Sequence, residues 1–159
     1  MTFRRSSFLT AAIALGLASC APPAPQPTTP ESPLATVKKP VRMNDRGKIT
    51  SISLTELFAL QQADQVLLYD ARPRFFYNLG HLPGAISLPK SADCDAQIIQ
   101  REAEIKAALA AKKTIVIYCT NLACPDARTV ATHLAGFGHS SSTLTGGWDA
   151  WQESGLPTE

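Results

Sequence analysis

The alternation of short, continuously apolar runs with helical patterns most constrains the fold of residues 49–159. Such runs are typical of strands buried on both faces, and strands alternating with helices indicate an α/β domain with a parallel sheet. A span of roughly 110 residues suits one compact domain. The sequence therefore predicts a single α/β domain with a central, mostly parallel five-stranded sheet flanked by helices. Its strands are "ITSI", "QVLLYDA", "AISLP", "KTIVIYC" and "STL".

The intervening segments carry signals for helix ends. Ser53 and Glu56 have the spacing of a capping box, in which each side chain binds the other residue's backbone amide. Another segment starts with Pro125 and ends in glycine, the usual asymmetry of helix termini. We expect helices over residues 53–61, 95–111, 125–138 and 146–155, and a loop with at most one helical turn over residues 72–84.

The first nineteen residues have the pattern of a secretory signal peptide. Arg4 and Arg5 precede an apolar run that ends at Ala18, and small residues lead to Cys20. The apolar run has about 11 residues, whereas a membrane-spanning helix needs roughly 20. "LASC" at residues 17–20 resembles the lipobox of bacterial lipoproteins, which implies cleavage before Cys20 and its modification by lipid such as palmitate. An ordinary signal peptide with an incidental cysteine is the alternative.

Residues 20–48 are predicted to be a tether behind the lipidated cysteine. Residues 21–40 hold seven of the twelve prolines and no aromatic residue. Such a segment buries too little apolar surface to offset its ordering entropy. We therefore expect a domain over residues 49–159 that is anchored in the cell envelope and faces the periplasm, with Ala21 favouring the outer membrane.

Net charge gives no reason to expect a nucleic-acid partner. Removal of residues 1–19 takes away Arg4 and Arg5. The remaining chain then has 13 of the 15 basic residues and 13 acidic residues. A near-neutral chain lacks the basic footprint that nucleic-acid binding requires. We expect a monomer that associates with the membrane through its lipid anchor.

The loop after the most apolar strand carries the residues best suited to chemistry. That strand ends at Cys119, and a helix begins near Pro125. Ligands of parallel α/β folds bind at the carboxyl ends of strands, and a helix N-terminus favours the nucleophilic thiolate. A buried structural cysteine is the alternative. The backbone amides expected to turn inward around a sulfur anion belong to Thr120, Asn121, Leu122, Ala123 and Cys124.

Three motifs, in order along the chain, resemble the rhodanese family over nearly the whole domain. "LLYDARPRFFYNLGHLPGAISLP" at residues 67–89 resembles its first signature and contains Asp70, Arg72 and His81. "IYC", with the following loop and helix, resembles the catalytic segment, and "LTGGWDAWQESGLP" resembles the C-terminal motif. We therefore expect a rhodanese-like fold.

The resemblance implies a sulfurtransferase with no metal and no organic cofactor. Cys119 would accept sulfane sulfur from a small donor such as thiosulfate, hold it as a persulfide, and pass it to a thiol or cyanide. Loop amides would stabilise the sulfur anion. Asp70, Arg72 and His81 match family positions that organise the loops around the site.

The loop departs from the family pattern at two positions. Many active members have glycine and arginine where this chain has Leu122 and Cys124. Either the loop takes a different path, or Asn121 supplies the left-handed conformation that glycine would allow. Without the arginine, a dianionic donor lacks a bidentate partner, for which Arg72, Arg74 or Arg128 is a replacement. A Cdc25-like phosphatase, which shares the fold, is not expected because no loop position is arginine.

Two other functions stay open. Cys94, Cys119 and Cys124 remain after Cys20, and an odd number leaves one thiol unpaired. A Cys119–Cys124 disulfide would make the chain a thiol–disulfide redox or regulatory protein, with Cys94 as a second possible partner. One cysteine pair is poor evidence for zinc. The other function is a catalytically silent binding module. We interpret the apolar residues Phe75, Phe76 and Leu79 as ordinary loop packing, and a border of the substrate entrance is the alternative.

Overall fold

The computed structural model describes residues 46–159, which lie within one compact unit. The signal peptide over 1–19, the lipidation site Cys20 and nearly all of the tether fall outside the described residues. Among residues 46–159, no helix combines the length and the apolar character needed to cross a bilayer.

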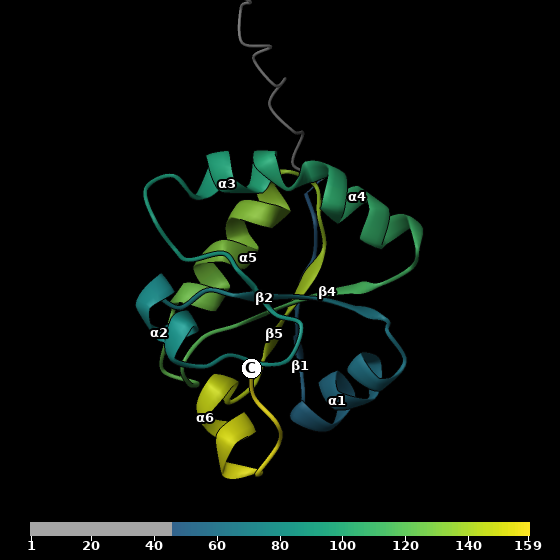
Figure 1. The fold of residues 1–159 in the computed structure, drawn as a ribbon. Coiled ribbons are helices and arrows are strands. Elements are labelled where there is room, and N and C mark those ends of the chain that lie inside the picture. Colours follow the sequence, from purple (N-terminus) through teal and green to yellow (C-terminus); the bar gives the residue numbers. More distant parts are fainter. Residues whose placement is uncertain (1–45) are drawn as a thin grey trace, which may run out of the picture. The chain divides into compact units, whose positions relative to one another are not determined.

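The prediction of a five-stranded parallel sheet is confirmed. All strand pairs are parallel, and the strand order across the sheet is β1-β5-β4-β2-β3 (Figure 1). Because the strands are parallel, their carboxyl ends lie at one edge, where the loops that follow them meet. The strands are β1 (Ile49–Ile52), β2 (Val66–Asp70), β3 (Ile86–Ser87), β4 (Thr114–Tyr118) and β5 (Ser141–Leu144).

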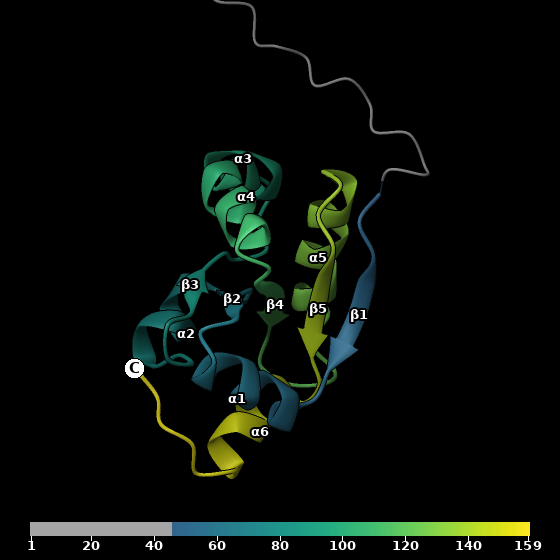
Figure 2. The same ribbon diagram turned by 90° about the vertical axis from the view of Figure 1, so that its right-hand side faces the viewer.

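Helices cover both faces of the sheet, and each face has its own apolar cluster (Figure 2). Side chains at alternate strand positions divide between the clusters: Leu67 and Ile117 pack with α3, α4 and α5, whereas Leu68 and Val116 pack with α1 and α6. All but the first residue of β2 and of β4 are buried, which explains why these strands are mostly apolar. The helices are α1 (Leu54–Gln62), α2 (Arg74–Leu79), α3 (Cys94–Gln100), α4 (Glu102–Ala110), α5 (Asp126–Gly136) and α6 (Gly147–Glu153).

The capping box at the start of α1 is confirmed. The Ser53 hydroxyl accepts a hydrogen bond from the Glu56 amide at 3.3 Å, and the Glu56 carboxylate accepts one from the Ser53 amide at 2.8 Å. The Ser53 hydroxyl also donates to the Glu56 carboxylate at 2.6 Å. This hydrogen bond, followed by the one from the Ser53 amide, lowers the pKa of Glu56. The pair fixes where α1 begins, directly after β1.

The prediction of one helix over residues 95–111 is wrong, because the helix breaks at Arg101. The Arg101 guanidinium donates to the Ser87 carbonyl at 3.0 Å and pairs with Glu104 at 3.4 Å. Arg101 lies between α3 and α4, and its side chain anchors this junction to β3. Near the end of α4, Leu109 is 40% exposed, whereas Ala108 is buried.

Residues 72–84 contain a six-residue helix, α2, which is somewhat longer than the single turn expected. The interpretation of its apolar residues as packing is wrong. Phe75, Phe76 and Leu79 are 67%, 48% and 72% exposed, since no described element covers this side of α2. The two phenyl rings contact each other edge to face, with centroids 5.5 Å apart.

Candidate functional site

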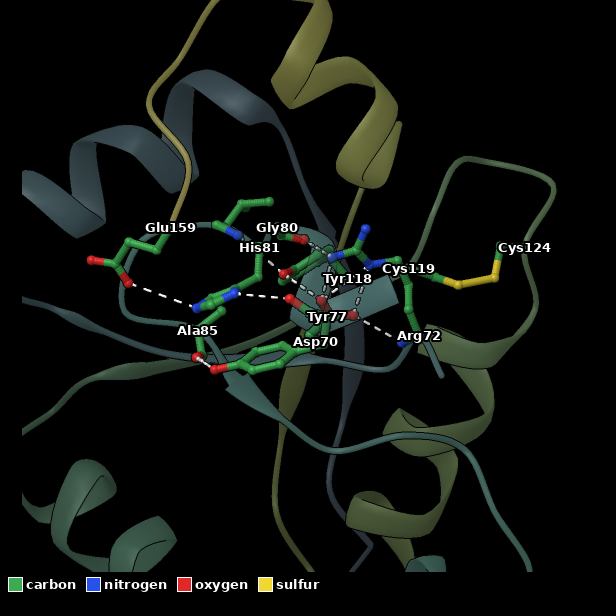
Figure 3. A network of polar contacts seen from close by, with 11 residues as sticks. Asp70, Arg72, Tyr77, Gly80, His81, Ala85, Tyr118, Cys119, Cys124 and Glu159 are labelled. Carbon is green, nitrogen blue, oxygen red and sulfur yellow. Dashed lines mark hydrogen bonds and ion pairs between the residues drawn. A yellow bond between two sulfur atoms is a disulfide. The ribbon is translucent and has the colours of Figure 1, made fainter. Parts of the chain in front are cut away.

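The loop between β4 and α5 is closed by a disulfide between Cys119 and Cys124, whose Cα atoms are 6.1 Å apart. Cys119 is buried at the end of β4, whereas Leu122, at the tip of the loop, is 80% exposed. The loop therefore begins inside the domain and extends into solvent. Figure 3 shows the disulfide beside the polar network of Asp70 and Arg72.

The beginning of the loop is bound by the N-terminus of α6. The amides of Trp148 and Asp149 donate to the carbonyl oxygens of Cys119 and Thr120, both at 2.9 Å. Gly147 makes this approach possible, because its φ is +59° and a Cβ there would overlap the Cys119 carbonyl. The Gly-Gly motif before Trp148 thus serves to position Cys119.

The middle of the loop is held by Asn121 in a way the sequence did not predict. The Asn121 side chain accepts a hydrogen bond from the Ala123 amide at 3.2 Å and donates one to Asp149 at 3.0 Å. Its φ is not positive, since Asp64 and Lys112 are the only described non-glycine residues with positive φ. Asn121 therefore does not supply the left-handed conformation. The remaining explanation for the missing glycine, a different loop path, fits the structure.

The loop amides do not all turn inward around Cys119 in the disulfide form. Ala123 donates to the Asn121 side chain, and Cys124 donates to the Asn121 carbonyl at 3.2 Å. The expectation of an inward ring from residues 120–124 is therefore wrong for these two amides. Amides that donate hydrogen bonds within the loop cannot at the same time donate to an anion at Cys119.

A buried ion pair lies behind the loop. The Arg72 guanidinium binds both carboxylate oxygens of Asp70, at 2.6 to 3.1 Å, and donates to the Gly80 carbonyl at 2.7 Å. Its carbon Cζ lies 4.4 Å from the centroid of the Trp148 ring. Burial opposes the charge of Arg72, but the hydrogen bonds and charge of Asp70 outweigh it and raise the pKa of Arg72. A guanidinium so engaged is not free to bind a donor anion.

Tyr118 completes the network from the last position of β4. Its hydroxyl donates to Asp70 at 2.6 Å and accepts from the Leu82 amide at 3.2 Å. Burial, followed by the charge of Asp70, raises the pKa of Tyr118 above its ordinary value, so the hydroxyl stays protonated. The network ties the ends of β2 and β4 to the loop containing Leu82. Within this network, Arg72 has a structural role.

His81 organises the loop after α2. Its ring stacks on Tyr77, with centroids 3.9 Å apart, and its Nδ1 lies 3.1 Å from the Tyr77 carbonyl. His81 and Glu159 exchange two backbone hydrogen bonds, at 2.8 and 2.9 Å, and the Nε2 atom lies 3.8 Å from the Glu159 carboxylate (Figure 3). These contacts are those of a structural side chain.

A cavity of about 250 Å³ opens over the disulfide. Arg128 of α5 lines it, and it is the one candidate replacement cation among Arg72, Arg74 and Arg128 that does so. A carboxylate oxygen of Asp126 and the two sulfur atoms lie within 4.8 Å of one another. The sulfurs are bonded to each other, so they offer a metal no thiolate in this form.

Cys94 is the free cysteine of the described residues, and it is buried at the start of α3 in the same apolar cluster as Cys119. Burial, followed by the charge of Asp95, raises the pKa of the Cys94 thiol. A protonated, enclosed thiol is a weak nucleophile. These surroundings favour a packing role for Cys94.

Sequence reasoning missed Trp148, Asp149 and Tyr118 as parts of the site. Trp148 lies in the C-terminal motif "LTGGWDAW", which pointed to the family but not to a contact with the cysteine loop. Tyr118 adjoins Cys119 in a buried strand, and its polar hydroxyl in such a strand is the signal for a buried hydrogen-bond partner.

The five-stranded parallel sheet and its cysteine loop at the end of β4 define a rhodanese-like α/β domain. The profile of the rhodanese-like domain family matches residues 53–154, and the chain belongs to this family.

Relatives differ in their overall organisation. A transcriptional regulator of the helix-turn-helix type from Mycobacterium tuberculosis is 34% identical over 112 residues, which cover 69% of this chain and 44% of the regulator. This chain therefore matches less than half the length of that curated relative.

Solved structures share the fold. The BH2092 protein of Bacillus halodurans has a TM-score of 0.57 and 24% identity, over 69% of this chain and 76% of that one. A thiosulfate sulfurtransferase from Pseudomonas aeruginosa has a TM-score of 0.51 and 25% identity, over 70% of this chain and 20% of that enzyme.

Proposed function

We propose that the chain is a sulfurtransferase that carries sulfane sulfur as a persulfide on Cys119. The observation that carries this proposal is the place of Cys119, at the carboxyl end of β4, beside a cavity and at the start of the loop that leads to α5. The similarity to part of a thiosulfate sulfurtransferase supports the same reaction class. The disulfide must first be reduced, because only the free thiolate attacks sulfur.

Transfer takes place in two steps. The Cys119 thiolate attacks the sulfane sulfur of the donor, an S–S bond forms, and the remainder of the donor leaves with the electron pair, as sulfite when the donor is thiosulfate. A thiol or cyanide then removes the sulfur and restores the thiolate. Because the intermediate is covalent, ping-pong kinetics are expected.

The charges near the sulfur favour donors of low negative charge. The carboxylate of Asp126 repels a dianion, and Arg128 is the cation that lines the cavity. We therefore expect persulfides of small thiols to load Cys119 faster than thiosulfate does. Faster loading of Cys119 by thiosulfate than by persulfides would contradict this interpretation of the charges around the loop.

Mass spectrometry of the full chain tests the reaction. After reduction and removal of the reductant, a sulfane donor should add about 32 Da to Cys119 in a variant in which Cys124 is serine. The Cys119→Ser variant is the control and should stay unmodified. Absence of the adduct with several donors would reject the sulfurtransferase and leave the redox or regulatory disulfide and the silent binding module.

We further propose that Cys20 carries lipid and holds the domain at the periplasmic side of the cell envelope. The support is the sequence of residues 1–20 alone. Fractionation of cells that express the Cys20→Ala variant should move the protein from the membranes to the soluble fraction. Continued membrane association of this variant would contradict lipid anchoring.

A further inference from the structure

We infer that Cys124 gives this site a second activity, the release of sulfane sulfur as sulfide. This inference rests on the proposed persulfide at Cys119. It assigns Cys124 the role of a resolving thiol that attacks the persulfide from within the same loop. The sulfur would then leave the protein without an external acceptor.

Proximity is the first argument. The Cys119–Cys124 disulfide shows that the two sulfur atoms reach bonding distance within the folded domain. Reduction of the disulfide leaves the Cys124 thiol beside Cys119, tethered by four intervening residues. A reacting group held in this way has a high effective concentration compared with a free thiol in solution.

The anchoring of the loop is the second argument. The Cys119 and Thr120 carbonyls are bound by α6, and the Ala123 amide is bound by Asn121 in the disulfide form. The disulfide therefore lies in a loop that is hydrogen-bonded at its start and in its middle. In this form β4 runs to Tyr118 and α5 begins at Asp126, so both elements are intact beside the closed loop.

The electrostatics of the loop are the third argument. A retained persulfide is an anion, and it needs amide donors or a cation close by. Here the Ala123 and Cys124 amides donate to Asn121, and a carboxylate oxygen of Asp126 lies within 4.8 Å of both cysteine sulfurs. Cys124 itself occupies the position of the arginine found in many members of the family. The loop thus disfavours storage of the persulfide and favours its discharge.

The step balances as a thiol–disulfide exchange. Cys124 sulfur attacks the Sγ atom of the Cys119 persulfide, the Cys119–Cys124 bond forms, and the bond to the sulfane sulfur breaks. The sulfane sulfur leaves as HS⁻ with the bonding electron pair and the proton of the Cys124 thiol. It is reduced by two electrons, and the two cysteine sulfurs are oxidised to the disulfide. A dithiol reductant of the thioredoxin class then reduces the disulfide for the next turnover.

A single-turnover experiment on the full chain tests the assignment. Reduced protein, freed of reductant, receives one equivalent of glutathione persulfide, and sulfide and protein mass are measured over time. Wild-type protein should release close to one sulfide per chain and end about 2 Da lighter, as the disulfide. The Cys124→Ser variant should hold the adduct of about 32 Da and release sulfide about 100-fold more slowly.

Matched variants separate the possible outcomes. Cys94→Ala should release sulfide as wild type does, since Cys94 is enclosed in the core, and Cys119→Ser should release none. Sulfide release by Cys124→Ser at the wild-type rate would overturn the role of Cys124. Loss of release in Cys94→Ala, with Cys124→Ser active, would assign the resolving thiol to Cys94 instead. A failure of Cys124→Ser to form the adduct would refute the proposed sulfurtransferase itself. Transfer of sulfur from that variant to cyanide shows that its site is intact.

Discussion

Replacement of Gly147 with alanine tests whether α6 positions the cysteine loop. Gly147 has a φ of +59°, and an added Cβ would overlap the Cys119 carbonyl oxygen and lie 2.9 Å from that of Thr120. Both oxygens are acceptors for the first amides of α6. The substitution therefore pushes on the two carbonyls that set the course of the loop.

Two costs add up in this variant. The left-handed conformation costs a residue with a Cβ about 1–2 kcal/mol. Overlap with backbone atoms in a packed region costs about 1–3 kcal/mol more. The free energy of unfolding should thus fall by about 2–5 kcal/mol. At about 4 °C per kcal/mol for a domain of this size, the midpoint of thermal unfolding should fall by about 8–20 °C.

Gly84→Ala is the matched control. Gly84 also has a positive φ, +71°, but no atom lies within 4 Å of the position its Cβ would take. This variant should show only the cost of conformation, about 1–2 kcal/mol. The difference between the two variants measures the contact with the Cys119 loop.

Circular dichroism of the reduced proteins gives the unfolding midpoints, and alkylation of Cys119 reports on the loop. Cys119 is 3% exposed in the disulfide form. In the reduced protein, Gly147→Ala should change the rate of Cys119 alkylation relative to wild type, whereas Gly84→Ala should not. Equal stability losses together with unchanged alkylation of Cys119 would refute the role of α6 as the support of the loop.

Two further predictions concern the buried groups of the core. Tyr118→Phe should lower the free energy of unfolding by about 1–3 kcal/mol in urea titrations, because the buried Asp70 carboxylate and Leu82 amide each lose a hydrogen-bond partner; a change within about 0.5 kcal/mol would contradict it. Folding raises the pKa values of Cys94, Tyr69 and Tyr118. The unfolded chain therefore loses these protons at lower pH than the folded chain. The contribution of these groups to the free energy of unfolding is complete below about pH 8.5, and it declines as the pH rises toward their pKa values in the folded state. Unfolding midpoints of the reduced chain between about pH 7 and pH 11 should show this decline, with its onset at higher pH in Cys94→Ala; an onset unaffected by that variant would exclude Cys94 as a contributor.

The strands and the fold class were predictable because their signals are local. Residues 115–117 are all aliphatic, and β4 forms around them in the middle of the sheet. The start of α1 was equally predictable, since the Ser53 and Glu56 side chains act within one turn. The break at Arg101 has no such signal, because neither proline nor glycine is present there. At the break, the Arg101 side chain contacts the distant Ser87 carbonyl, and the local sequence does not indicate this contact.

The candidate site was predictable in its position and not in its internal contacts. The strand, cysteine, loop and helix follow one another in the sequence, so the place of Cys119 could be deduced. The Cys119–Cys124 pairing remained one of several alternatives, since three cysteines admit more than one pair. The contact of Asn121 with Asp149 spans 28 positions, and no local pattern indicates it. Exposure of Phe75 and Phe76 was missed because it depends on which elements cover α2.

The two ends of the loop are held separately, so the stretch between them can be exchanged as a unit. α6 binds the chain at Cys119 and Thr120, and α5 begins at Asp126, so only a short exposed stretch lies between two fixed points. A stretch of equal length from another protein of this fold would meet the same strand, the same helix and the same two carbonyl acceptors. Substitutions within this stretch can therefore alter the chemistry of the loop while the contacts of the sheet and its helices stay the same.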